Sequence, residues 1–349
     1  MLDFLMVGWE QDYSRNKVLV NKHEHLYKQV VITKENIFKR SYKIFFKTMY
    51  GLIRYKTKCV YIPAFNQSHA PIVILLSKFF RKKVILDILV SDYDTFVQDR
   101  KLVSPKSIRA KKAYWFDNFC IKYSDYLICD TELHKTFFID TFNGQEEKFK
   151  VIPVGADENF FEKFSPINTD PNELKVLFYG GFSPLHGIDK IIYAAELLKG
   201  ENITFTLVGD GQTRKSIENL VGKLELKNIK FIDYINYNHL PEFISHFDVG
   251  LGIFGDTEKA HRVVPNKVYQ LAACGKPIIT LNTEGIKSIF THKENMLLVN
   301  DYKELANALM ELKKDKHFMK HLGDNALRVM EEECSIPKIR EEFKHLIQS

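Results

Sequence analysis

Short runs of apolar residues alternate along the chain with longer segments in which apolar residues recur every three or four positions. The short runs fit β-strands, and the longer segments fit amphipathic helices. In the first half the expected strands are 3–7, 29–33, 59–62, 83–89, 126–129 and 151–154, and the expected helices are 40–55, 67–80, 106–123 and 131–142. This alternation is typical of β-α-β units, which form parallel sheets with helices on both faces.

The pattern breaks at 162–173, where EKFSPINTDPNE contains two prolines and few apolar residues, as expected of a linker. A second series follows, with strands at 175–179, 204–208, 229–232, 249–253, 277–280 and 296–299, helices near 187–199, 212–224, 239–246, 265–273 and 284–290, and closing helices from 302 to 347. We therefore predict an α/β protein with two doubly wound Rossmann-like domains, at 1–165 and 166–334, and a C-terminal helix at 335–349. Ligands in such folds bind at the carboxyl ends of the strands, and the cleft between two domains is the expected active site.

Composition narrows the class of protein. With 45% hydrophobic and 27% charged residues over 349 positions, the chain can bury large cores, which excludes general disorder. No apolar run is long enough to cross a membrane, and the first residues lack the features of a signal peptide. The five cysteines are scattered, and none forms a C-x-x-C pair, which argues against a disulfide framework and a zinc ribbon. We therefore expect a cytoplasmic location.

Positive charge is concentrated in the first half of the chain. Residues 1–150 carry 26 Lys and Arg against 16 Asp and Glu, and residues 15–58 alone carry 12 against 2. On a helix, the stretch Lys39–Lys56 has a basic flank of Arg40, Lys43, Lys47 and Arg54 and an apolar side of Ile44, Phe45, Met49, Leu52 and Ile53. One interpretation is a peripheral helix on an anionic membrane surface, at the inner face of the plasma membrane. The other is an ordinary helix packed on its sheet with a solvated basic face. Nucleic acid is not an expected partner, because no RNA-binding signature is present.

A glycine-containing turn follows the first strand of the second half. Gly180 and Gly181 come directly after the strand, and His186 and Gly187 lie just before the next helix. Paired glycines let the backbone approach a phosphate, and a helix N-terminus supplies free N–H groups. The alternative is a tight turn without a ligand.

A second candidate segment opens a later helix. Pro265 suits the first position of that helix, and Asn266, Lys267 and Gln270 follow on one face. Arg262 and Lys267 are expected at the helix start, where cations oppose the helix dipole unless an anion is bound there too. We expect a nucleotide donor at this site, with the amide of Gln270 bonding a ribose hydroxyl. The alternative is that Lys267 is a solvated surface lysine and Gln270 has a structural role.

Three further positions follow strands. Gly209 ends one strand in a Gly-Asp-Gly turn, which either contacts the donor or is an ordinary turn in which Asp210 caps the next helix. Tyr234 follows the next strand, where it is expected to contact the base of a nucleotide. In the first half, Asp92 and Asp94 follow the strand at 83–89. We expect these carboxylates to act on the acceptor or in catalysis, with metal ligation and simple loop structure as alternatives.

These residues resemble a glycosyltransferase with the GT-B fold, of the family-4 retaining type. The resemblance is carried by the glycine turn, by FTLVGDG at 205–211, by Phe247–Phe254 and by VPNKVYQLAACGKPII at 264–279. The first half adds SDYDTFVQDRK at 91–101, CDTELHKTFF at 129–138 and VIPVGAD at 151–157. The resemblance implies a nucleotide-diphosphate sugar on the second domain, an acceptor on the first, a final helix that returns to the first domain, and no metal or other cofactor.

The chain departs from the family pattern at several positions. The common E-x7-E pair falls on Arg262 and Gln270, the usual Arg and Lys of the glycine turn fall on Phe182 and His186, and Leu89 stands about where a histidine is often placed. We infer that neutralisation of the diphosphate has moved to the later helix. The expected function is transfer of a sugar, of the hexosyltransferase type, to a glycan or lipid-linked acceptor in bacterial surface polysaccharide synthesis, with retention of configuration. The alternatives are a sugar-nucleotide epimerase and a non-catalytic donor-binding subunit.

Overall fold

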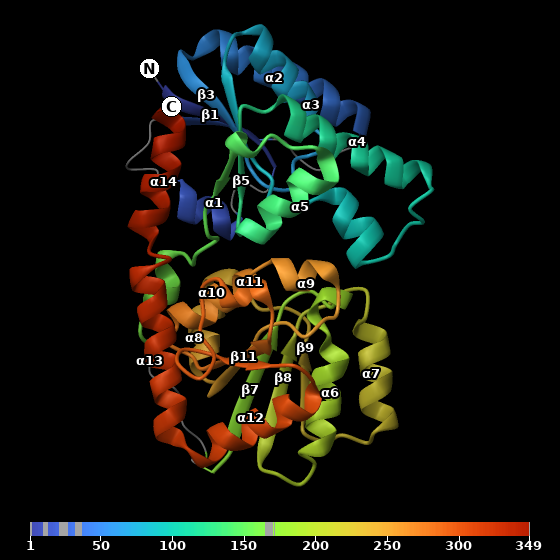
Figure 1. Ribbon diagram of the computed structural model, residues 1–349, viewed down its shortest axis with the longest axis vertical. Coiled ribbons are helices and arrows are strands. Elements are labelled where there is room, and N and C mark those ends of the chain that lie inside the picture. Colours follow the sequence, from blue (N-terminus) through green and yellow to red (C-terminus); the bar gives the residue numbers. More distant parts are fainter. Residues whose placement is uncertain are drawn as a thin grey trace. The chain divides into compact units, whose positions relative to one another are not determined.

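A computed structural model describes residues 2–9, 13–20, 27–31, 37–164, 170 and 172–348, and the chain divides into two compact units (Figure 1). The first unit comprises Met1–Val154 together with Ile336–Ser349, and the second comprises Gly155–Ser335. The predicted boundary at 165–166 lies outside the described residues, as do parts of the predicted strand at 29–33 and of the predicted linker at 162–173. The observed division comes earlier in the chain than that boundary.

The first unit contains a six-stranded sheet in which every neighbouring pair is parallel. In chain order the strands are β1 (Leu2–Gly8), β2 (Tyr27–Val31), β3 (Thr57–Ile62), β4 (Lys83–Asp87), β5 (Tyr126–Cys129) and β6 (Phe149–Val151), and their spatial order is β2-β1-β3-β4-β5-β6. Strands covered on both faces are solidly apolar, which is why Val84, Ile85 and Leu86 are all fully buried. All six predicted strands are present.

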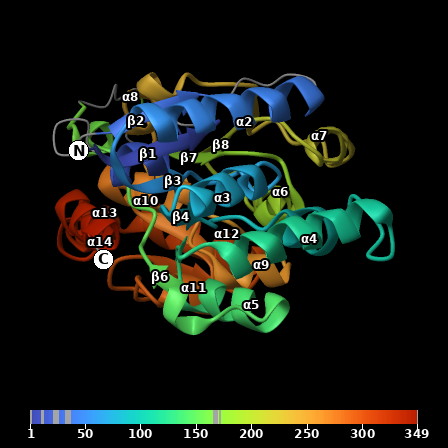
Figure 2. The same cartoon turned by 90° about the horizontal axis from the view of Figure 1, so that it is seen from above.

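Helices cover both faces of this sheet. They are α1 (Ser14–Leu19), α2 (Ile37–Arg54), α3 (Ala70–Phe79), α4 (Ile108–Tyr123), α5 (Glu132–Phe142) and α14 (Ile336–Gln348), with the π-helix η1 (Asp94–Asp99) and the short 3₁₀ turn η2 (Glu146–Lys148). Right-handed crossovers place α2, α3, α4 and α5 on one face, where α2 contacts α3 and α3 contacts α4 (Figure 2). On the other face, α14 contacts α1 and β3, so the last helix completes the first unit.

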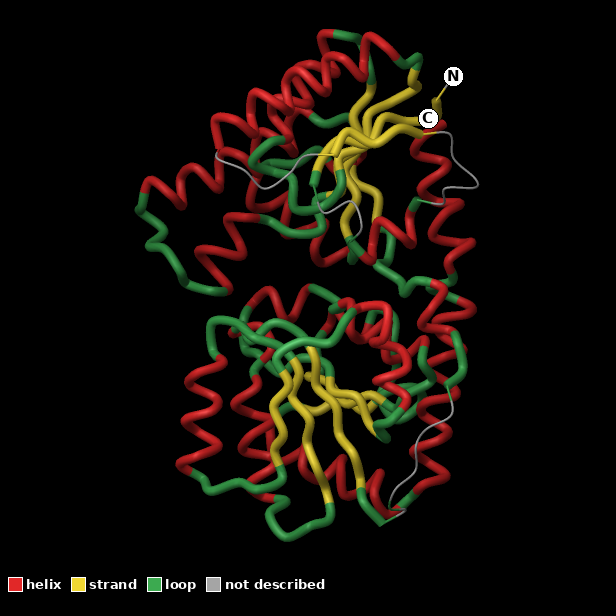
Figure 3. Tube along the Cα trace, turned by 180° about the vertical axis from the view of Figure 1, so that it is seen from behind, coloured by secondary structure: helices red, strands yellow, loops and turns green. Residues whose placement is uncertain are grey.

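The second unit repeats this plan with its own parallel sheet (Figure 3). Its strands are β7 (Leu174–Tyr179), β8 (Ile203–Val208), β9 (Ile229–Ile232), β10 (Val249–Leu251), β11 (Ile278–Leu281) and β12 (Leu297–Val299), in the spatial order β12-β11-β10-β7-β8-β9. Its helices are α6 (Ile188–Leu197), α7 (Arg214–Lys223), α8 (Leu240–Ser245), α9 (Glu258–Arg262), α10 (Asn266–Ala273), α11 (Glu284–Lys287), α12 (Tyr302–Lys314) and α13 (Lys316–Glu332), with the 3₁₀ turns η3 (Glu158–Phe161), η4 (Pro184–His186) and η5 (Tyr237–His239). All six predicted strands of this half are present.

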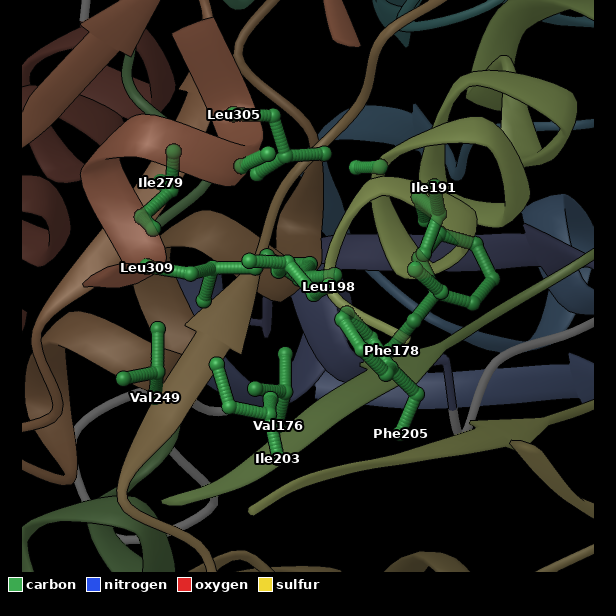
Figure 4. Packing of buried hydrophobic residues seen from close by; sticks show 14 of the residues in the cluster. Val176, Phe178, Ile191, Leu198, Ile203, Phe205, Val249, Ile279, Leu305 and Leu309 are labelled. Carbon is green, nitrogen blue, oxygen red and sulfur yellow. The ribbon is translucent and has the colours of Figure 1, made fainter. Parts of the chain in front are cut away.

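The core of the second unit lies between its sheet and two helices (Figure 4). Phe178 and Phe205 come from adjacent strands, Ile191 comes from α6, and Leu305 and Leu309 come from α12. All five side chains are fully buried. Because this core anchors the strands, it fixes the positions of the loops that leave their carboxyl ends.

The structure corrects the predicted apolar side of the basic helix. In α2, Ile44 and Leu52 are buried as predicted, but Phe45 and Ile53 are exposed and Met49 is only half-buried. The reason is the small residue Gly51, where an added Cβ would lie 2.9 Å from Leu5 Cδ2. The side of α2 that holds this glycine packs closely on the sheet, and the larger apolar residues face away. Within the part of the chain that is described, no helix is long and apolar enough to cross a membrane.

Candidate donor site and acceptor-side carboxylates

The second sheet has a point at which the strand order reverses. β7 lies between β8 on one side and β10 on the other, so the connections that leave β7 and β10 run in opposite directions. In open α/β sheets, the crevice outside the carboxyl ends of such strands is where ligands bind. The predicted glycine turn, which follows β7, lies at this crevice.

The glycine turn packs tightly against the loops from β8 and β10. Gly209 has a φ of +128°, and a Cβ added there would lie 2.0 Å from the carbonyl oxygen of Gly180. Gly187 has a φ of +55°, and an added Cβ would lie 2.3 Å from Phe254 C. The amide of Phe254 donates to the carbonyl of His186 at 3.0 Å. Glycine is therefore required at Gly187 and Gly209 for packing, independently of any ligand.

Lys267 lies at the centre of this arrangement. It is in the first turn of α10, and its side chain is 5% exposed. Among the described residues, no hydrogen-bond partner lies within reach of its Nζ atom. That atom is 3.6 Å from the centre of the Phe178 ring, and it lies 3.1 Å from the position of a Cβ built on Gly180, with His186 Nε2 3.6 Å from the same point. Burial lowers the pKa of Lys267 well below the usual range.

A buried ammonium group without an acceptor is costly in the free protein. The turn around Gly180, the His186 ring and the N-terminus of α10 all lie near this ammonium, so several donors surround one small volume. Such an arrangement is suited to the negative charge of a phosphate group. The structure therefore brings together Gly180, His186 and Lys267, which the sequence placed in separate segments.

Gln270 lies one turn further along α10 and is held by a strand residue. The Tyr179 hydroxyl donates to Gln270 Oε1 at 3.0 Å and is 3.3 Å from the carbonyl of Lys267. This contact uses the amide oxygen of Gln270 and leaves its NH₂ group as the donor for a ligand. The sequence did not indicate Tyr179, because a tyrosine at a strand end is ordinary in a buried parallel sheet.

Two details of the predicted helix start are wrong. Pro265 is the N-cap of α10, with a ψ of 146°, and Asn266 is the first helical residue. Arg262 ends α9 and lies before the start of α10. The short helix α9 was not predicted. Lys267 is thus the cation in the first turn of α10.

The remaining donor-site predictions lie at the neighbouring strand ends. Gly181 continues the turn after β7, and Tyr234 is exposed in the loop that follows β9. The sequence missed Arg214, which donates to the carbonyl of Gly209 at 2.5 Å and is 4.5 Å from the ring of Phe231. Arg214 therefore holds the loop after β8 in place.

In the first unit, the predicted carboxylates follow β4. Asp92 is half-buried, and Asp94 is fully buried at the start of η1. Asp117, on α4, accepts hydrogen bonds from the Ser91 hydroxyl at 2.7 Å and from the amides of Tyr93 at 2.9 Å and Asp92 at 3.3 Å. Burial, together with the nearby charge of Asp92, raises the pKa of Asp117 to about 7. The sequence missed Asp117, because it lies on a distant helix.

A second buried polar group lies near the carboxyl ends of β4 and β5. Arg15, on the unpredicted helix α1, forms an ion pair with Asp87 at 2.5 Å, and both side chains are fully buried. His134 Nδ1 lies 2.6 Å from Asp130 Oδ1. These contacts join α1, the sheet and α5, so we assign them a structural role. In the described part of the chain, no three His, Cys, Asp or Glu side chains are grouped as metal ligands would be.

Comparison with known proteins finds similarity mainly in the second unit. Residues 159–329, which make up most of the second unit, match the family described as "Glycosyl transferases group 1". Two uncharacterized glycosyltransferases of Methanocaldococcus jannaschii are 22% identical over 256 residues and 28% identical over 227 residues. These alignments cover 68% and 61% of this chain, and they span about three fifths of the relatives, 63% and 57% of their lengths.

Solved structures are similar over the whole chain. Anabaena Alr3699/HepE, in a crystal structure with UDP-glucose, has a TM-score of 0.76 at 16% identity, and the match covers 100% of both chains. Sucrose-phosphate synthase from Thermosynechococcus elongatus has a TM-score of 0.70 at 18% identity, and the match covers 91% of this chain and 79% of that one. The chain thus has the GT-B fold of these structures, and residues 159–329 of its second unit are similar to the glycosyl transferases group 1 family.

Proposed function

We propose that the protein transfers a sugar from a nucleotide-diphosphate sugar to a glycan or lipid-linked acceptor. The observation that carries the proposal is the buried Nζ atom of Lys267, which lies beside Gly180 and His186 at the reversal point of the second sheet. The charged form of this group is stabilised by an anion, and the matching domain family and the UDP-glucose bound by the HepE structure point to a nucleotide diphosphate as that anion.

In this proposal, the second unit stabilises the leaving group. Lys267, His186 and the amide of Gly181 neutralise the diphosphate as the bond to the sugar breaks, which is electrostatic catalysis by preorganised donors. The amide of Gly180 donates to the carbonyl of Val208 at 3.0 Å and holds the turn in place. The NH₂ group of Gln270 donates to a ribose hydroxyl, and Tyr179 fixes its orientation. Burial strengthens each of these interactions, because little water competes for the charge.

The finer parts of the function are also proposals. We propose that transfer retains the anomeric configuration, that Asp92 acts on the acceptor, and that the reaction uses no cofactor besides the sugar nucleotide. Asp92 is favoured over Asp94, because Asp94 is fully buried. A role in bacterial surface polysaccharide synthesis is supported by a putative colanic acid glycosyl transferase of Escherichia coli, which is 27% identical over 106 residues. That match covers 30% of this chain and 26% of the relative. The cytoplasmic location stays a prediction.

Calorimetric titration with a panel of nucleoside diphosphates, UDP first, tests the donor site. We expect one diphosphate to bind at a single site and Lys267→Met to weaken it about a hundredfold, since a charge-assisted contact to a buried group is lost. Lys276→Met is the matched control. Lys276 is half-buried, and its Nζ atom donates to the carbonyls of Ser245 at 3.0 Å and Phe247 at 2.6 Å. Equal affinity in wild type and Lys267→Met would remove the proposed site.

Incubation of the best-bound sugar nucleotide with lipid-linked acceptors then tests transfer. A glycosylated acceptor supports a transferase, and proton NMR of the new linkage reports whether configuration is retained. Release of an isomerised sugar nucleotide without an acceptor would instead indicate an epimerase. Tight binding with neither product would indicate a donor-binding subunit, the alternative favoured by the absence of carboxylates at Arg262 and Gln270.

A further inference from the structure

The outward face of α2 carries a continuous stripe of large apolar side chains. Its members recur at the three- and four-residue spacing that places side chains on one side of a helix; they are Tyr42, Phe45, Phe46, Met49, Tyr50 and Ile53. Except for Met49, all are exposed, and Ile53 is 66% exposed. The Phe46 ring lies 4.4 Å from Tyr42 and 5.2 Å from Phe45, centre to centre. A large exposed apolar patch of this kind indicates an interaction surface.

A basic stripe runs beside the apolar one. Helical spacing places Lys39, Lys43, Lys47 and Arg54 on the adjacent flank of α2, and all four are exposed. Arg40, which was predicted on this flank, is half-buried, with its Cζ atom 4.8 Å from the centre of the Trp9 ring. The helix contains no acidic residue, and residues 15–58 carry 12 basic and 2 acidic residues. We call the apolar and basic stripes together the α2 face. Aromatic side chains flanked by lysines are the pattern of helices that lie in the surface of an anionic bilayer.

The neighbouring helices continue the same chemistry. α3, which contacts α2, exposes Leu75 and Phe79. α4, which contacts α3, exposes Ile108 and Trp115, and Lys111 lies between them at helical spacing. These three helices lie next to one another on the same face of the first sheet (Figure 2), so adjacent helices carry these exposed apolar residues. Exposed apolar residues spread over three helices suit a lipid plane better than a narrow peptide.

We propose that the α2 face binds an anionic lipid bilayer, with the aromatic stripe entering the headgroup region and the basic stripe contacting lipid phosphates. The charge balance of the segment favours this occupant over a second copy of the chain, because two like-charged helices would repel each other. The proposal is independent of sugar transfer. Donor binding is measured without lipid, so either proposal can fail while the other stands.

Vesicle flotation with the full chain tests the proposal. The probes are phosphatidylcholine vesicles and vesicles in which about one third of the lipid is phosphatidylglycerol, at low and high salt. We expect binding to the anionic vesicles to be much stronger than binding to neutral vesicles at low salt, and to be reduced but not abolished by high salt, because apolar insertion is insensitive to screening. Lys43→Gln with Lys47→Gln should lower the partition coefficient about thirtyfold at low salt. Phe45→Ser with Phe46→Ser should abolish the binding that remains at high salt.

Matched controls come from the second unit. Lys223→Gln with Lys227→Gln removes two exposed lysines, and Leu197→Ser removes an exposed apolar residue. Both should bind vesicles as the wild type does, and all variants should keep the wild-type circular dichroism. Equal binding to neutral and anionic vesicles, or wild-type binding by both α2 variants, would overturn the proposal. The proposal would also be overturned if the wild type did not bind vesicles but formed a dimer in sedimentation velocity, and if Phe45→Ser with Phe46→Ser converted that dimer to a monomer.

Discussion

Two buried ionisable side chains, Lys267 and Asp117, have pKa values displaced towards the neutral form. In each case burial is the largest cause, and each group is on a helix, next to a loop after a strand where a site was predicted. Displaced pKa values gather at functional sites because the same burial that shifts them also strengthens contacts to a ligand. At the residue scale, the pH dependence of donor binding and of the free energy of unfolding therefore tests the roles of these two side chains directly.

Donor binding should take up a proton at Lys267. Burial lowers the pKa of Lys267 in the free protein, and a bound diphosphate favours the ammonium form and raises that pKa. Affinity should therefore be greatest below the lowered pKa and fall as pH rises through the window up to the bound-state pKa. Calorimetry at about pH 8, where an ordinary histidine is neutral, in buffers of different ionisation enthalpy measures the uptake. No uptake in wild type, or the same uptake in Lys267→Met, would contradict this prediction.

Asp117 should make the first unit less stable as pH rises. Its pKa is raised to about 7 in the folded chain, against about 3.9 for an unperturbed aspartate, so the folded state binds the extra proton between these values. The free energy of unfolding should therefore fall between about pH 4 and pH 7. The side chain at position 117 cannot titrate in Asp117→Asn. The free energy of unfolding of this variant should therefore rise by on the order of 3 kcal/mol relative to that of the wild type between about pH 4 and pH 7. Urea unfolding at both pH values checks this, and a parallel pH response of the two proteins would contradict it.

At the scale of elements, the loops of the second sheet are fixed by close backbone contacts. Gly209→Ala should destabilise the protein by about 3 kcal/mol or more, because the new Cβ would meet the carbonyl of Gly180 at a positive φ. Gly222→Ala, on α7, is the control, since an added Cβ there meets no atom within 4 Å. It should be neutral or stabilising by about 0.5–1 kcal/mol. The denaturant midpoints of the two variants check this prediction. Similar midpoints would show that the loop around Gly209 accommodates the added Cβ at little cost.

The elements themselves were largely predictable. All twelve strands lie at the predicted places, because parallel strands buried on both faces are short solid apolar runs. Helices α1 and α9, of six and five residues, were missed. The candidate site was only partly predictable. Lys267 and Gln270 stand out at a helix start, but Tyr179, Arg214 and Asp117 act through contacts with residues distant in sequence, which no local pattern encodes.

At the scale of the whole molecule, the chain leaves the first unit, builds the second and returns. Phe343, on α14, is fully buried, with its ring 5.8 Å from Phe4 and 5.0 Å from Tyr61. Both tryptophans, Trp9 and Trp115, belong to the first unit. Tryptophan fluorescence therefore reports the unfolding of the first unit alone.

Phe343→Ala should destabilise the first unit by about 3–5 kcal/mol, through loss of a buried ring and the cavity it leaves. The fluorescence transition should move to lower denaturant, while nucleoside diphosphate binding by the second unit stays unchanged. Phe205→Ala is the matched control, because Phe205 is equally buried in the core of the second unit. It should weaken diphosphate binding and leave the fluorescence midpoint in place. Identical shifts for both variants would show that the units unfold together.

The return of α14 to the first sheet also bears on how the protein is made. A ribosome synthesises residues 155–335 before it reaches Ile336, so the second unit has its whole sequence available while the first still lacks one covering helix. Until then, the apolar side of β1 and β3 that Phe343 later covers is exposed to the cell. Nascent chains stalled before residue 336 should therefore bind chaperones through the first unit, which is synthesised first, rather than through the second unit.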